Sequence, residues 1–263
     1  MDESGTPTSV GEWRNEMALP VEPDTAAEPL LELEGVDAGY AAFRALFGVS
    51  FAVTEGSALA LLGSNGSGKT SVARVISGLI TPTDGCMRFA GEDVTGVSAW
   101  RLTRLGIAHA PEGRSVFASL SVEENLVLAF RQSLGRSGVA AALERAYERF
   151  PALAGRRRQS AGTLSGGEQR MLSLARVFAD PPRLLVVDEL SLGLAPAIVD
   201  SVFDALEEIR ARGTTLVVIE QHVDRALRLA DHVVLLAKGR VIYRGLAAEI
   251  GDEVERLLPG EPA

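Results

Sequence analysis

The sequence is poor in the residues that form disulfides and zinc sites, and it has no long apolar run. Its 263 residues include one cysteine and three histidines, which excludes an intramolecular disulfide and a Cys/His zinc cluster. No apolar run approaches the roughly 20 residues that cross a bilayer. The first thirty residues lack a basic start and an apolar core, so we expect no signal peptide. The net charge of −9 argues against nucleic acid as a partner. Together these absences predict a soluble cytoplasmic protein.

Lysine is also scarce. Of 26 basic residues, 24 are arginine, and the only lysines are Lys69 and Lys238. The planar guanidinium of arginine and the compact ammonium of lysine are not interchangeable. A lysine kept against this bias therefore suggests a position where a compact charge is needed. The arginine run 156–158 is predicted to be a solvated face.

The composition and the apolar patterning of the chain change after residue 28. Residues 1–28 carry seven acidic side chains, one arginine and three prolines without apolar periodicity, so we predict a disordered acidic tail. Over 29–263 we expect one domain. Apolar runs at 58–62, 184–187, 216–219 and 233–236 predict buried strands, with helical spacing between them. Within residues 121–180, the stretches 122–130, 139–150 and 168–179 show helical spacing with no strand between them, which predicts a helical insertion. This alternation favours an α/β fold with a mainly parallel sheet, in which His109 is expected to be structural.

A glycine-rich segment follows the strand predicted at 58–62. It reads Gly-Ser-Asn-Gly-Ser-Gly-Lys-Thr, fits G-x-x-x-x-G-K-[ST] and opens a helix. Such a loop points backbone N–H groups at one anion, and the helix start adds its dipole. Lys69 would reach the β- and γ-phosphates, and Thr70 would offer a hydroxyl to Mg²⁺. We therefore predict a nucleoside triphosphate site formed by Gly63, Ser64, Asn65, Gly66, Ser67, Gly68, Lys69 and Thr70.

Two carboxylates end the strand predicted at 184–187. Strand ends line the ligand crevice of open α/β sheets, and adjacent strand residues point in opposite directions. Asp188 would hold Mg²⁺, whereas Glu189 would face the γ-phosphate and polarise the attacking water.

A third motif, Leu-Ser-Gly-Gly-Glu-Gln at 164–169, stands between these two. With all three motifs the sequence resembles the ATP-binding subunit of an ABC transporter over about residues 30–258. The resemblance implies a P-loop NTPase with a mainly parallel sheet, an N-terminal antiparallel β subdomain and an inserted α-helical subdomain. It also implies that a second subunit's γ-phosphate contacts the segment, so that two chains sandwich two ATP molecules head-to-tail. The contacting residues would be Ser165, Gly166, Gly167 and Glu168.

Other family positions are matched one by one. Tyr40 matches the aromatic residue that stacks on adenine; the alternative is a core tyrosine. Glu112 stands where the family usually has a glutamine that senses Mg²⁺ and the membrane partner. Gln221 stands where most members have a switch histidine, and the neighbouring His222 is the alternative for that role.

The departures from the family pattern resemble one subgroup. Pro-Glu-Gly-Arg at 111–114, Ser-Leu-Gly-Leu-Ala-Pro at 191–196 and Glu-Gln at 220–221 are similar to the second ATP-binding subunit of importers of branched-chain amino acids and related amides. This implies an ATPase, producing ADP and phosphate, at the cytoplasmic face of the plasma membrane. Its implied partners are transmembrane permease subunits, a sister ATP-binding subunit and, indirectly, an extracytoplasmic substrate-binding protein. The alternative is a non-transport ABC ATPase acting in DNA repair or on ribosomes. The single phosphate loop and the lack of sustained heptads count against it.

Overall fold

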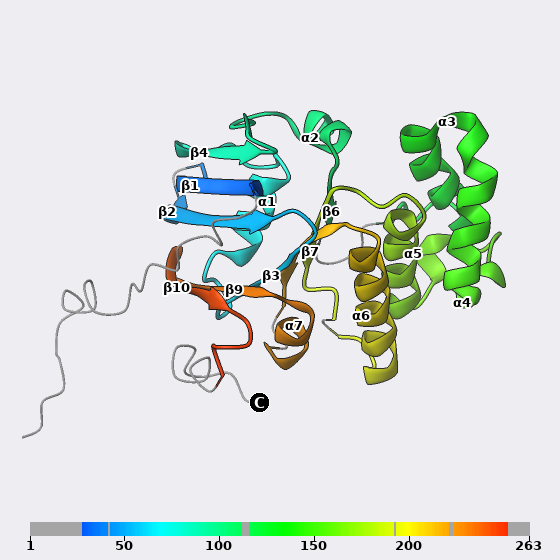
Figure 1. The fold of residues 1–263 in the computed structure, drawn as a ribbon. Coiled ribbons are helices and arrows are strands. Elements are labelled where there is room, and N and C mark those ends of the chain that lie inside the picture. Colours follow the sequence, from blue (N-terminus) through cyan, green and yellow to red (C-terminus); the bar gives the residue numbers. More distant parts are fainter. Residues whose placement is uncertain (1–27, 42, 112–115, 192, 221–222, 252–263) are drawn as a thin grey trace, which may run out of the picture.

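The computed structural model describes residues 28–41, 43–111, 116–191, 193–220 and 223–251 (Figure 1). The strands are β1 (Pro29–Tyr40), β2 (Phe43–Thr54), β3 (Ala58–Leu62), β4 (Asp84–Phe89), β5 (Glu92–Asp93), β6 (Ile107–Ala110), β7 (Leu184–Asp188), β8 (Thr215–Ile219), β9 (His232–Ala237) and β10 (Arg240–Leu246). The helices are α1 (Lys69–Ile76), α2 (Ala99–Leu105), α3 (Val122–Arg149), α4 (Pro151–Ala154), α5 (Gly166–Ala179), α6 (Pro196–Ala211) and α7 (Val223–Leu229), with a 3₁₀ turn at Ala161–Thr163.

Two sheets organise the described chain. The first has the order β2-β1-β4-β5 and its strand pairs are antiparallel. The second has the order β10-β9-β3-β8-β7-β6, in which only the β10–β9 pair is antiparallel. In Figure 1 the first sheet lies at one end of the molecule and α3, α4 and α5 lie at the other. The predicted α/β class, with its antiparallel β subdomain and inserted helices, is confirmed.

The central strands are buried on both faces. All five residues of β7 are buried. Leu184 and Val186 join the core formed with β1, β2 and α1, whereas Leu185 and Val187 join the core formed with α3, α5 and α6. A strand covered on both faces has no position that favours a polar residue, which explains the unbroken apolar runs at 58–62 and 184–187.

Where it is described, the segment between β6 and β7 consists of helices and the loops that join them. A capping box starts α3: Ser121 Oγ accepts from Glu124 N at 3.2 Å, and Glu124 Oε2 accepts from Ser121 N at 2.7 Å. The sequence spacing predicts two separate helical stretches, at 122–130 and 139–150. The structure separates them at Gly135, whose φ of 68° is not helical. Within the described ranges no helix combines the length and the apolarity that a membrane span needs.

Candidate functional site

The parallel strands bring the predicted site segments to one edge of the second sheet. Because β3, β6, β7, β8 and β9 run in the same direction, the segments that follow them all leave from the same edge. These segments begin with Gly63 after β3, Pro111 after β6, Glu189 after β7, Glu220 after β8 and Lys238 after β9. Residues far apart in the sequence therefore meet there.

The phosphate loop is fixed between this edge and α1. Gly68 precedes α1 with a left-handed φ of 110°, which glycine adopts readily. A Cβ on Gly63 would lie 2.4 Å from the Leu236 carbonyl oxygen, so the close approach to β9 requires glycine. Ser67 N donates to Ser64 O at 3.0 Å, and Gly239 N donates to Ser67 O at 2.8 Å. The loop is thus held against the turn between β9 and β10.

Lys69 is buried at the start of α1. The residue is only 4% exposed. Its Nζ donates to Gly63 O at 2.5 Å and to Ser64 O at 3.2 Å. The loop carbonyls therefore hold the ammonium within the phosphate loop. Because α1 contacts β7 and β8, Thr70 lies in the same cavity as Glu189.

The two carboxylates at the end of β7 differ in position. Asp188, the last residue of β7, is 1% exposed. Glu189 has a φ of 48° and its N–H donates to Ile219 O at 2.8 Å, and it lines the cavity. This left-handed backbone, uncommon for a residue with a Cβ, turns the chain away from the strand. Asp188 therefore lies buried at the end of the strand, whereas Glu189 lines the cavity because the chain turns after β7, not because of strand alternation.

One cavity of about 770 Å³ is lined by Tyr40 and by five of the eight phosphate-loop residues, all but Gly63, Ser64 and Ser67. Its lining residues are Tyr40, Phe43, Arg44, Ala45, Phe47, Asn65, Gly66, Gly68, Lys69, Thr70, Ser71, Glu189, Lys238 and Gly239. Tyr40 is 39% exposed, so it is not a core tyrosine. Its hydroxyl accepts from Arg74 Nη1 at 2.9 Å, and the Arg74 guanidinium lies 5.5 Å from the ring centroid.

Several site residues were missed from the sequence. Phe43 and Phe47 of β2 line the cavity, and so does Lys238 in the turn after β9. For Lys238 the scarcity of lysine in the sequence was a signal, because the only two lysines of the chain both line this cavity. The sequence motifs also indicate no role for Glu220. It is 2% exposed and accepts from Ser191 N at 3.1 Å and from Ser191 Oγ at 2.5 Å, so it fixes the segment that follows Glu189.

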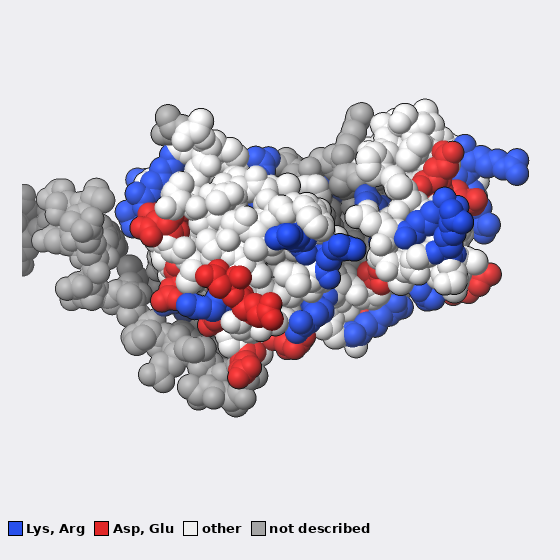
Figure 2. Space-filling model, turned by 90° about the horizontal axis from the view of Figure 1, so that it is seen from above, with Lys and Arg blue, Asp and Glu red and all other residues white. Residues whose placement is uncertain are grey.

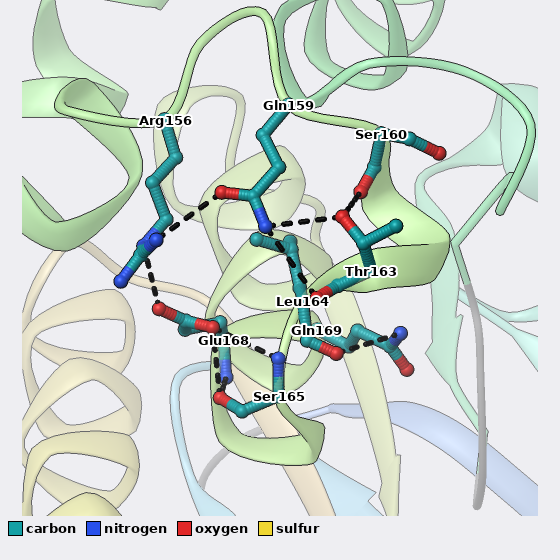
Figure 3. A network of polar contacts seen from close by, with 8 residues as sticks. All are labelled: Arg156, Gln159, Ser160, Thr163, Leu164, Ser165, Glu168 and Gln169. Atoms are coloured by element: carbon teal, nitrogen blue, oxygen red, sulfur yellow. Dashed lines mark hydrogen bonds and ion pairs between the residues drawn. The ribbon is translucent and has the colours of Figure 1, made fainter.

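The signature segment is not part of the lining of this cavity. It forms the start of α5 (Figure 3). A capping box forms there: Glu168 Oε2 accepts from Ser165 N at 2.8 Å and from Ser165 Oγ at 2.9 Å, while Glu168 N donates to Ser165 Oγ at 3.3 Å. The backbone hydrogen bond from Ser165 is the main cause that lowers the pKa of Glu168 below 4.5. Ser165 and Gly166 are exposed, and a Cβ on Gly166 would meet nothing within 4 Å. The helix start is therefore open to an anion.

Three candidate residues lie outside the described residues. They are Glu112, expected to sense Mg²⁺, and the two alternatives for the switch position, Gln221 and His222. Their roles stay predictions.

The comparisons with known proteins agree with the geometry. The sequence pattern of the ABC transporter family matches residues 46–191. The high-affinity branched-chain amino acid transport ATP-binding protein BraG of Pseudomonas aeruginosa is 37% identical over 84% of this chain and 94% of its own length. The probable branched-chain amino acid transport ATP-binding protein LivF of Archaeoglobus fulgidus is 35% identical over 88% of this chain and 99% of its own length. A crystal structure of a nucleotide-free ATP-binding cassette from an ABC transporter superposes with a TM-score of 0.75 at 26% identity, covering 89% of this chain and 96% of that one.

Proposed function

We propose that this chain, which belongs to the ABC transporter family, energises the import of branched-chain amino acids or related small amides. ATP hydrolysis coupled to transport is the family's activity. The observation that carries the proposal is the meeting of Lys69, Thr70 and Glu189 at one cavity. The substrate class is supported by the likeness to the branched-chain amino acid transport ATP-binding proteins BraG and LivF.

In the proposed site the phosphate loop binds the phosphates of ATP and Tyr40 binds the base. The backbone N–H groups of the loop cradle the phosphates, and Lys69 exchanges its loop carbonyls for the β- and γ-phosphate oxygens. Tyr40 stacks on the adenine. These interactions position the triphosphate and neutralise its charge, which is most of what phosphoryl transfer requires.

Mg²⁺ fits the donors of this chain. The Thr70 hydroxyl and the Asp188 carboxylate are hard oxygen ligands, which Mg²⁺ prefers alongside substrate phosphates. Among the described residues there is no group of three or more His, Cys, Asp or Glu that could hold a metal ion. When bound, the ion neutralises charge on the phosphate oxygens.

Glu189 orients and polarises the attacking water, and Gln221 bridges this water and the γ-phosphate.

A second subunit completes the proposed site. The cavity lining does not include Ser165, Gly166 or Glu168, so the chain's own signature segment does not close over its own phosphate loop. We infer that the signature segment caps the γ-phosphate held by a sister ATP-binding subunit, head-to-tail. Loss of that phosphate on hydrolysis removes the shared contact and lets the two subunits separate.

The separation is proposed to drive transmembrane permease subunits at the cytoplasmic face of the membrane. Three exposed apolar side chains are candidate contacts for them: Trp100 on α2 is 57% exposed, Phe117 is 50% exposed and Leu128 on α3 is 45% exposed. Figure 2, seen from above, shows uncharged surface interrupted by groups of Lys or Arg and of Asp or Glu side chains. A substrate-binding protein outside the membrane would take part only through the permease.

Uptake of labelled leucine tests the proposal. Cells that carry the permease genes should take up leucine with this chain and lose uptake without it. The Lys69→Ala chain is the matched control, because it should still assemble with the permease but fail to bind the phosphates. Equal uptake with the parent chain and with Lys69→Ala would refute the assigned function.

A further inference from the structure

Arg156 is connected to the helix start that carries Ser165. Arg156 Nε lies 2.7 Å from Glu168 Oε1, and its Nη1 donates to Gln159 Oε1 at 3.2 Å. Gln159 Nε2 in turn donates to Thr163 Oγ1 at 3.0 Å. Figure 3 shows these side chains converging on the first turn of α5. The loop after α4 and the signature segment therefore form one polar network.

The three consecutive arginines of this loop are not equivalent. All three are exposed, as the predicted solvated face requires. Arg156 pairs with Glu168, whereas the Arg157 guanidinium lies 4.1 Å from the ring centroid of Tyr147. Arg158 supplies the same charge two residues away and is a natural control.

Glu168 creates an electrostatic conflict at the helix start. A helix N-terminus attracts anions, yet here a carboxylate oxygen accepts from both the N–H and the hydroxyl of Ser165. A phosphate that arrives at the same hydroxyl would meet this negative charge. The repulsion grows when a second subunit excludes water, because the effective dielectric constant falls. A cation paired with the other carboxylate oxygen offsets the repulsion.

We propose that Arg156 is a positioning residue for the Ser165 cap: its ion pair with Glu168 cancels the carboxylate charge, so that the cap accepts the γ-phosphate of a nucleoside triphosphate held by the opposing subunit. The inference rests on the proposed function, because it requires a triphosphate from a second subunit. Arg156 acts through Glu168 and need not touch the nucleotide.

A double-mutant cycle in the assembled transporter tests the inference. ATP hydrolysis is measured against ATP concentration for the parent, Arg156→Ala, Glu168→Gln and the double variant. Arg156→Ala should lower kcat/KM roughly tenfold, the effect of one uncompensated charge several ångströms from the phosphate at an intermediate dielectric constant. In the Glu168→Gln background the same substitution should cost less than about twofold, because no carboxylate charge remains to offset.

Three further measurements separate charge compensation from a merely structural role. Arg156→Lys, which keeps the charge, should retain most of the activity, and Arg158→Ala should stay within about twofold of the parent. Binding of a fluorescent ATP analogue to the full-length chain alone should be unchanged in Arg156→Ala, because the phosphate loop is intact.

The inference fails if the roughly tenfold loss persists in the Glu168→Gln background, or if Arg156→Ala behaves like Arg158→Ala. Either result, in a parent transporter that hydrolyses ATP, leaves the proposed function standing. A parent transporter without ATPase activity would defeat the proposed function and this inference together.

Discussion

Lowering the pH from 7 to 5 should destabilise this fold through one side chain, His109. Its Nε2 is buried in β6 without a hydrogen-bond partner in the described chain. Burial, helped by the charge of Arg74, lowers the pKa of His109 from 6.5 to about 4. Folded His109 therefore stays neutral at pH 5, whereas its imidazole in the unfolded chain takes up a proton.

The magnitude follows from these two pKa values. Between pH 6.5 and pH 4 the unfolded state binds more protons at this position than the folded state, so the free energy of unfolding falls as the pH falls. From pH 7 to pH 5 the expected loss is about 2 kcal/mol. The decline from this group ends below about pH 4, where both states are protonated.

Urea unfolding of the parent and of His109→Gln at both pH values isolates the effect. The carboxylates and the remaining histidines are the same in the two proteins. Their contributions therefore cancel in the difference between the two unfolding free energies. The difference in unfolding free energy between parent and variant should change by about 2 kcal/mol between pH 7 and pH 5. An unchanged difference, or an NMR titration that places the His109 midpoint near that of a free imidazole, would refute the reasoning.

Three further substitutions test the cavity and its support. Tyr40→Ala should weaken binding of a fluorescent ATP analogue roughly tenfold while Tyr40→Phe keeps it; equal affinities for these two variants would remove the stacking role. Lys238→Gln should weaken the same binding about threefold at low ionic strength and have little effect in high salt, whereas a salt-independent result would argue against a charge contact. Glu220→Gln should lower the free energy of unfolding by about 1–2 kcal/mol, because the Ser191 hydroxyl loses its charged acceptor; urea unfolding showing no change would contradict that contact.

The sequence predicts the buried strands of the second sheet well but does not predict α2 or β10. The strand expected at 58–62 is β3, and the strand expected at 184–187 lies within β7. By contrast α2 buries only Leu102, and β10 is an edge strand with mostly exposed or half-buried positions. Both carry apolar side chains at exposed positions, such as Trp100 in α2 and Ile242 in β10, so their apolar residues do not mark a buried face.

Some parts of the candidate site can be predicted from the sequence, and others cannot. The phosphate loop and the signature segment are contiguous, so their chemistry can be read locally. The pairing of Ser191 with Glu220 joins residues 29 positions apart and depends on the register of β7 against β8. Phe43, Phe47 and Lys238 reach the cavity through the packing of β2 against the turn that follows β9. No local pattern encodes such contacts.

Nucleotide binding and turnover by Glu189→Gln, measured with Mg²⁺ beside the parent and Lys69→Ala, test the central claim most directly. Glu189→Gln should bind ATP as tightly as the parent and hydrolyse it about a hundredfold more slowly, because the water loses its polarising carboxylate. Lys69→Ala should lose affinity for ATP. Hydrolysis by Glu189→Gln at the parent rate, or ATP binding by Lys69→Ala as tight as that of the parent, would contradict the account.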